Sequence, residues 1–122
     1  MSRQQRAIDV GEAASELGSF LRKLRGGRNE PQWRVAAAAE MDSASLSKIE
    51  LGDRLPTPEQ AGLLARFFGV PLREIERRRI AAKFWLEHGN NPAVAAAAEA
   101  IHDTATAYVV NKPVNKPGKV SR

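Results

Sequence analysis

Residues 40–54, EMDSASLSKIELGDR, carry small polar side chains where a core helix would carry bulky ones. The first helical turn consists of aspartate, serine and alanine, and Lys48 is the only cation near the middle. Small residues allow close approach to another surface, and serine hydroxyl and lysine ammonium groups can donate hydrogen bonds to that surface. An ordinary capped surface helix explains the same letters, and on this segment alone we favour that explanation.

Apolar spacing and capping residues predict six helices. The first carries Leu17, Leu21 and Leu24 at i, i+4 and i+7 and ends at a Gly-Gly pair. The other five are, in chain order, PQWRVAAAAE, the segment above with Asp42 as its N-cap and Gly52 at its end, TPEQAGLLARFFGV, PLREIERRRIAAKFWLEHG and NPAVAAAAEAIHDTATAY. Because no segment reads as a strand, the predicted fold class is all-α.

The predicted core takes one apolar stripe from each of the first four helices. In the fourth helix Thr57 and Gln60 form a capping box, and Pro58 occupies the first helical position. The residues expected to face inward from the second to fourth helices are Val35, Ala36, Ala39, Leu46, Ile49, Ala61, Leu64, Ala65 and Phe68.

The second and third predicted helices are short and joined by a tight turn, which are the requirements of a helix-turn-helix. In that motif one helix lies across the DNA backbone. The next enters the major groove, about 12 Å wide, with its N-terminal residues at the base edges. Small polar residues in the first turn allow this approach, while Leu46 and Ile49 hold the other side on the core. A DNA groove facing this turn would therefore explain its small polar residues, with a capped surface helix as the alternative.

Residues 17–75 resemble the phage-repressor-like (lambda-repressor or Xre-type) helix-turn-helix regulators. The resemblance is carried by LGSFLRKLR, PQWRVAAAAEMDSASLSKIELGDRLPTPEQ and LARFFGVPL. It implies a five-helix lambda-repressor-like DNA-binding domain, followed by one long or two additional C-terminal helices. We divide the chain into an N-terminal arm (1–15), the DNA-binding domain (16–78), a helical dimerisation or partner-binding extension (79–110) and a disordered basic tail (111–122).

The resemblance implies which residues contact bases. Ser43, Ala44 and Lys48 match base-contact positions, and Ser47 lies at the margin of that surface. Lys48 can donate to guanine O6 or N7, Ala44 can touch a thymine methyl group, and Ser43 can either donate or accept.

Other residues match family positions that contact the DNA backbone or stabilise the domain. Gln32 matches a position that hydrogen-bonds a phosphate and helps to seat the third helix, and Arg54 is a candidate phosphate contact. Trp33 could press against the sugar-phosphate backbone, or pack under the N-terminal arm. Arg25 and Glu50 match a partly buried ion pair that ties the first helix to the third, which is a structural role.

Two residues depart from the family pattern. Glu40 stands where the turn between the helices usually carries glycine. Either the turn differs, or Glu40 accepts a mildly strained left-handed conformation, and its negative charge is unfavourable near DNA. Ala39 replaces a larger apolar residue, so Met41 or Phe20 is expected to fill the space.

The extension carries apolar residues that need a packing partner: Ile80, Phe84, Trp85, Ile101 and Tyr108. They could pack within one chain as a helical hairpin, or between two chains. Two-fold dimers are the commonest assembly, and a helix-turn-helix dimer reads half-sites about 34 Å apart. We therefore expect a homodimer with much of its interface in residues 79–108.

The net charge of +5 supports DNA binding only weakly, because the excess lies at the two ends and residues 31–75 are close to neutral. Arg3, Arg6 and the tail lysines could form basic arms on DNA, with uncommitted solubilising tails as the equal alternative. Residues 76–80, ERRRI, are expected to be a solvated helix face, with a phosphate contact by Arg77 or Arg78 as the less favoured alternative.

Composition limits the other classes of function. The absence of cysteine excludes disulfides and thiolate metal sites, and His88 and His102 lack nearby ligand partners, so we expect no metal and no cofactor. No apolar run suits a signal peptide or a membrane span, so a cytoplasmic protein is expected. There is no nucleophile–base constellation or phosphate-binding loop, so we do not expect an enzyme.

Two functional hypotheses remain from the sequence. The first is a double-stranded DNA-binding transcriptional regulator, a repressor that binds a palindromic operator as a dimer. The alternative is an antitoxin-like adaptor whose C-terminal helices bind a partner protein. Residues 17–75 resemble both classes, so this region cannot separate them.

Overall fold

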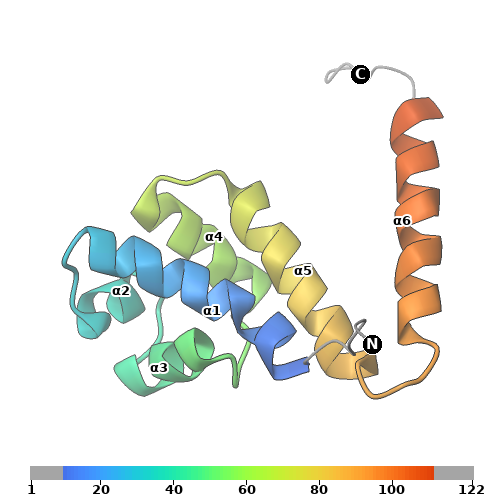
Figure 1. The fold of residues 1–122 in the computed structure, drawn as a ribbon. Coiled ribbons are helices and arrows are strands. Elements are labelled where there is room, and N and C mark those ends of the chain that lie inside the picture. The colour runs from blue at the N-terminus through green and yellow to red at the C-terminus, as the bar shows by residue number, and fades with distance from the viewer. Residues whose placement is uncertain (1–9, 112–122) are drawn as a thin grey trace. The chain divides into compact units, whose positions relative to one another are not determined.

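The structure is a computed structural model that describes the backbone of residues 10–111 and the side chains of residues 15–108. The described chain forms six α-helices and no strand, which confirms the all-α fold class (Figure 1). The helices are α1 (Val10–Gly27), α2 (Gln32–Ala38), α3 (Ser43–Leu51), α4 (Pro58–Phe68), α5 (Leu72–His88) and α6 (Val94–Asn111).

The chain divides into two compact units between Gly89 and Asn90. The first unit contains α1 to α5, and the second contains α6. One helix therefore follows the five-helix unit, in agreement with the first of the two expected arrangements for the C-terminal region.

The core of the first unit lies between its five helices. Helix α1 packs along α5 and over α3, while α2 contacts α3 and α4 (Figure 1). The buried side chains, each at most 5% exposed, include every residue predicted to face inward from α2, α3 and α4: Val35, Ala36, Ala39, Leu46, Ile49, Ala61, Leu64, Ala65 and Phe68. Leu17 and Leu21 of α1 are buried as predicted, and Ile75 of α5 joins them although the sequence had not indicated it. Leu24 is half-buried at the edge of this cluster. Burial of these aliphatic stripes is the main stabilising contribution to the fold.

Local sequence fixes the ends of α3 and α4. Asp42 caps α3 by accepting from the Ser45 backbone N–H at 2.7 Å, and Thr57 and Gln60 form both hydrogen bonds of the predicted capping box on α4. Gly52 and Gly69 end the two helices with φ of 87° and 68°, a conformation that favours glycine.

Three helix ends can be compared with the boundaries that the sequence suggested. Helix α1 begins at Val10, so residues 10–15 of the expected arm are helical. Helix α5 continues unbroken to His88, so the expected boundary at residues 78 and 79 falls inside it. Asn111 ends α6, while the rest of the expected basic tail and residues 1–9 lie outside the described residues.

Arg78 is not part of a solvated face, contrary to expectation. Its guanidinium carbon lies 3.8 Å from the centroid of the Phe20 ring, and its side chain is 13% exposed. Arg78 also donates to the Glu74 carbonyl at 2.6 Å and lies 3.4 Å from the Glu16 carboxylate. These contacts tie α5 to α1, because a stacked guanidinium contributes both cation–π attraction and packing.

Candidate nucleic-acid interface

The turn between α2 and α3 is short and left-handed at Glu40, whose φ is 59°. Two backbone hydrogen bonds close the end of α2: Met41 N–H donates to the Ala36 carbonyl at 2.9 Å, and Glu40 N–H donates to the Ala37 carbonyl at 3.0 Å. This is the pattern that usually ends in glycine. Of the two outcomes expected for this position, Glu40 accepts the strained conformation and the turn geometry is kept.

Ala39 is fully buried in the core cluster. Met41 and Phe20, which were expected to fill the space left by the smaller residue, are both half-buried against the same cluster.

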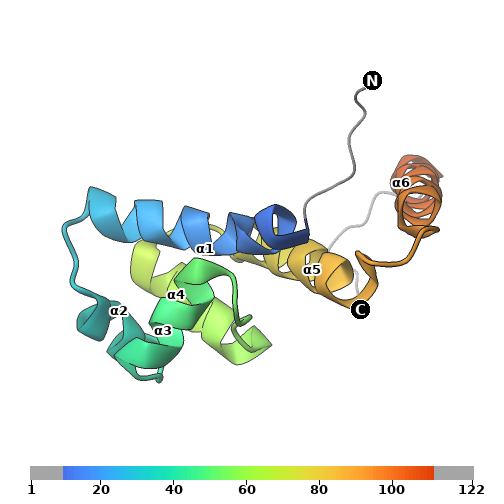
Figure 2. The ribbon, with the colours of Figure 1, turned by 60° about the horizontal axis from the view of Figure 1, so that its bottom comes forward.

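The orientation of α3 exposes a strip of small residues with one cation. Leu46 and Ile49 are 0% and 2% exposed and hold the inner side on the core. Ala44 and Lys48, one helical turn apart, are exposed on the outer side. Figure 2 shows α2 and α3 together on one side of α1, with α3 at the surface of the unit.

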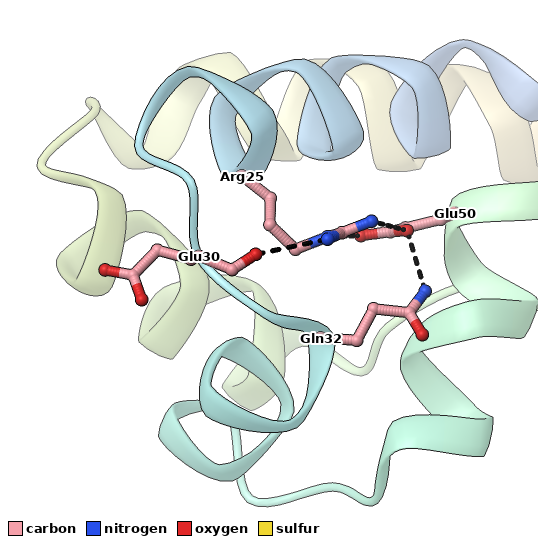
Figure 3. A network of polar contacts seen from close by, with 4 residues as sticks. All are labelled: Arg25, Glu30, Gln32 and Glu50. Carbon is pink, nitrogen blue, oxygen red and sulfur yellow. Dashed lines mark hydrogen bonds and ion pairs between the residues drawn. The ribbon is translucent and has the colours of Figure 1, made fainter.

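Ser43 and Ser47 are half-buried. They precede Glu50 by seven and three residues and so share its side of α3. Glu50 faces α2, because its carboxylate accepts from Gln32 (Figure 3). The four residues expected to contact bases therefore lie on the outer side of α3 and on its edge towards α2.

A buried carboxylate joins α1, α2 and α3. The Glu50 side chain is 3% exposed and accepts from Arg25 Nε at 2.7 Å and Arg25 Nη2 at 3.0 Å (Figure 3). Gln32 Nε2 donates to the same carboxylate at 3.0 Å, and Arg25 Nη1 donates to the Glu30 carbonyl at 3.1 Å. The hydrogen bond with Glu50 raises the pKa of Arg25, so the guanidinium stays charged.

This network holds α3 against the two preceding helices. Each carboxylate oxygen of Glu50 is hydrogen-bonded, which is the condition under which a buried charge is tolerated. The expected Arg25–Glu50 pair is present in the geometry, and Gln32 lies where it can seat α3.

Trp33 projects from the outer side of α2 and is 64% exposed. It follows Gln32 directly, at the first turn of the helix. Packing under an N-terminal arm would require residues outside the described part of the chain.

Arg54 lies against the edge of α3 opposite to α2. Its Nη1 donates to Ser45 Oγ at 2.8 Å, and Ser45 N–H donates to the Asp42 carboxylate. Hydrogen bonds from Ser45 lower the pKa of Asp42, and the nearby positive charges of Arg54 and Lys48 act in the same direction. The loop cation is therefore held beside the outer face of α3.

The charge around this face is nearly balanced. Within residues 40–54 the exposed acidic side chains are Glu40, Asp42 and Asp53, and the exposed cations are Lys48 and Arg54. A large non-specific attraction to phosphates requires several unopposed cations. The net charge of this segment therefore gives it little non-specific attraction to a polyanion.

Replacing Glu40 with glycine should stabilise the protein. A left-handed conformation costs a non-glycine residue about 1–2 kcal/mol, and part of this gain is offset by the greater chain entropy of glycine. We expect the Glu40→Gly variant to gain about 0.5–1 kcal/mol in unfolding free energy, measured by urea denaturation.

The Glu40→Gln variant is the matched control, because it removes the charge but keeps the side-chain carbon atoms. It should leave the unfolding free energy within about 0.5 kcal/mol of the wild-type value. Equal stability of the glycine and glutamine variants would show that the left-handed residue is not strained.

Sequence reasoning missed two residues that position these helices. Arg28 donates to the carbonyls of Phe67 and Phe68 at 2.9 Å each, and so satisfies the free carbonyls at the end of α4. Gly18 faces α3 so closely that an added β-carbon would overlap the carbonyl oxygens of Ile49 and Glu50. The sequence signal for Gly18 was its place inside a helical pattern, which often marks a close approach.

The residues expected at a protein interface lie in both units. In α5, Ile80 is 58% exposed, while Phe84 and Trp85 are half-buried. The rings of Phe84 and Trp85 pack edge to face, with their centroids 5.3 Å apart. In α6, Ile101 and Tyr108 are 55% and 60% exposed.

Among the described residues no cluster of three histidine, cysteine, aspartate or glutamate side chains is arranged to hold a metal ion. No helix there is long and apolar enough to cross a membrane.

The α2–α3 pair, with its buried inner side and exposed outer side, defines a helix-turn-helix protein. A family model described as a helix-turn-helix domain matches residues 16–78, just over half of the chain. The chain belongs to this family. No curated protein and no solved structure is significantly similar to the chain.

Proposed function

We propose that this protein is a transcriptional regulator of the phage-repressor-like (Xre) type that binds double-stranded DNA sequence-specifically. The observation that carries the proposal is the orientation of α3, with Leu46 and Ile49 buried and Ala44 and Lys48 exposed. A helix whose inner side chains are anchored in the core and whose outer side chains are small can enter a major groove. A regulator of this kind acts on prokaryotic or phage DNA, so we place it in the cytoplasm and expect no catalytic activity.

We assign base contacts to Ser43, Ala44, Ser47 and Lys48. The Lys48 side chain is exposed on α3, so its ammonium group is available to guanine O6 or N7. The serine hydroxyls can donate or accept, and the Ala44 methyl group suits a thymine methyl group.

We assign backbone contacts to Gln32, Trp33 and Arg54. Gln32 and Trp33 begin α2, the helix that lies across the phosphates in this motif. Arg54 is held at the other edge of α3 by Ser45. Backbone contacts fix the register of the protein on DNA without reading its sequence.

Substitution of the two cations tests this division of roles. The Lys48→Ala variant should lose about 1–3 kcal/mol on the preferred duplex and relax base choice at one position. The Arg54→Ala variant should weaken binding to all duplexes by a similar factor and reduce the salt dependence. Fluorescence anisotropy on a panel of single-base variants of the duplex measures both effects. If the Lys48→Ala variant keeps the wild-type affinity and base preference, the proposed base contacts of α3 are wrong.

We further propose that the protein acts as a homodimer on a palindromic operator, as a repressor that occupies the promoter. Support comes from the exposed apolar residues of the extension, Ile80 on α5 and Ile101 and Tyr108 on α6. Large apolar side chains at regular helical spacing are typical of an interface. Val94, Ile101 and Tyr108 recur every seven residues along α6, as in paired helices.

Light scattering tests the dimer. We expect a dimer at tens of micromolar, and we expect the Ile101→Glu variant to be monomeric, because a glutamate carboxylate would be buried without a partner. His102→Glu is the control, since it adds the same charge about 100° away around the helix and should remain dimeric. A monomeric wild-type protein, both with and without operator DNA, would contradict the dimer.

The second candidate function is an antitoxin-like adaptor, in which the extension binds a different protein. The same exposed residues favour it, because Ile80 and Ile101 suit any apolar partner. A partner that co-purifies with the wild-type protein in a fixed ratio, and is lost with Ile101→Glu, would support this alternative over the homodimer.

A further inference from the structure

The outer face of α3 continues past Lys48 to a leucine. Leu51 is 58% exposed and is the only large apolar residue of α3 outside the core. We infer that Leu51 is a specificity-determining residue that contacts the 5-methyl group of a thymine in the half-site. The inference rests on the proposed DNA-binding function and adds a base contact to it.

Leu51 lies on the same face of α3 as Ala44 and Lys48, which are proposed to contact bases. Ala44, Lys48 and Leu51 follow the spacing i, i+4 and i+7, and at 100° per residue they lie within about 60° of one another around the helix. Leu46 and Ile49 occupy the opposite side and are buried. Any surface that Ala44 and Lys48 approach together is therefore also within reach of Leu51.

The chemical groups in the major groove indicate which base Leu51 would contact. Base edges present hydrogen-bond donors and acceptors there, and the thymine methyl group is their apolar feature. A leucine side chain has no hydrogen-bond donor or acceptor. Contact with the thymine methyl group therefore strengthens binding, whereas contact with a polar base edge weakens binding because the donors and acceptors of that edge are left unpaired. Leu51 thus favours thymine at the position it covers.

The spacing along α3 predicts where that thymine lies. Leu51 follows Lys48 by three residues, a rise of about 4.5 Å, and neighbouring bases are about 3.4 Å apart. The thymine should therefore lie one or two base pairs from the guanine that Lys48 contacts, towards the C-terminal end of α3.

Exchange of single thymines for deoxyuridine tests this contact directly, because it removes only the methyl group. A preferred duplex is first selected from a randomised pool with the full chain, and each thymine is then replaced in turn. One buried methyl group corresponds to about a fourfold change in affinity. We expect one exchange beside the guanine to weaken wild-type binding by about fourfold. The same exchange should have no effect on Leu51→Ala, which should already bind the thymine duplex about fourfold more weakly.

Leu72→Ala is the matched control, since Leu72 is 49% exposed at the start of α5. It should keep the wild-type sensitivity to every exchange, and circular dichroism should show Leu51→Ala and Leu72→Ala equally folded. If wild type and Leu51→Ala respond alike at each thymine, or Leu51→Ala weakens all duplexes equally, Leu51 does not read a base. That result would leave the proposed function intact, whereas a pool that stays random would overturn both.

Discussion

The Arg25→Ala variant should lose about 3–5 kcal/mol of unfolding free energy, because it leaves the buried Glu50 carboxylate without its counter-charge. The Glu50 side chain is 3% exposed, and Arg25 supplies two of the three hydrogen bonds that it accepts from side chains. Gln32 alone cannot compensate a full negative charge. Since the expected loss is a large part of the stability of a small domain, DNA binding should fail together with folding.

Two further variants separate the burial of charge from the loss of an ordinary surface contact. Arg34 Nε lies 3.3 Å from a carboxylate oxygen of Glu30, and the Arg34 side chain is 60% exposed, so Arg34→Ala should cost less than about 1 kcal/mol. Replacing both Arg25 and Glu50 with methionine and leucine should recover most of the stability, because no unpaired charge is then buried. Urea denaturation measures all three. An Arg25→Ala loss as small as that of Arg34→Ala would show that the pair does not anchor α3.

The Gly18→Ala variant should be destabilised by about 1–3 kcal/mol, because α1 and α3 would have to separate. The added methyl group would overlap the carbonyl oxygens of Ile49 and Glu50, which are backbone atoms and cannot rotate away. The shift would displace the last turn of α3, so we expect DNA affinity to fall even where the protein remains folded.

Gly62→Ala is the control for helix propensity. Gly62 lies inside α4, and an added β-carbon there meets nothing within 4 Å. Alanine should therefore stabilise that helix by about 0.5–1 kcal/mol. If thermal denaturation shows Gly18→Ala to be as stable as Gly62→Ala, the close approach of α1 and α3 is absent.

Local features of this fold could be predicted from the sequence because their physical causes are local. The Thr57–Gln60 capping box spans three residues, and Gly52 and Gly69 end helices through their own backbone freedom. The core stripes were predictable for the same reason, since burial follows helical spacing.

Long-range polar contacts could not be predicted from spacing. Arg28 satisfies carbonyls 39 and 40 residues away, and Arg78 stacks on Phe20 across two helices. Both cations look like solvated surface residues in the sequence, because their partners are brought close only by the fold. Arg25 and Glu50 are 25 residues apart in sequence, and their pairing was expected only through the resemblance.

The candidate site was predictable in part. Helical spacing alone indicated that Leu46 and Ile49 face inward, which leaves Ala44 and Lys48 outside. The conflict at Glu40 was visible as a missing glycine, but its outcome depended on the hydrogen bonds of Met41 and Glu40 to α2. The sequence pattern did not single out Leu51, because a leucine in the last turn of a helix is usually part of the core.

The most direct test of the central claim is selection of binding sites from a randomised duplex pool with the wild type and with Lys48→Gln, at about physiological salt to suppress ionic binding. Glutamine pairs with adenine N6 and N7, whereas lysine pairs with guanine O6 and N7. We predict a palindrome containing a guanine in each half-site for the wild type, and adenine at that position for Lys48→Gln. The same enriched sequence for both proteins, or a wild-type pool that stays random, would contradict the claim that α3 reads DNA.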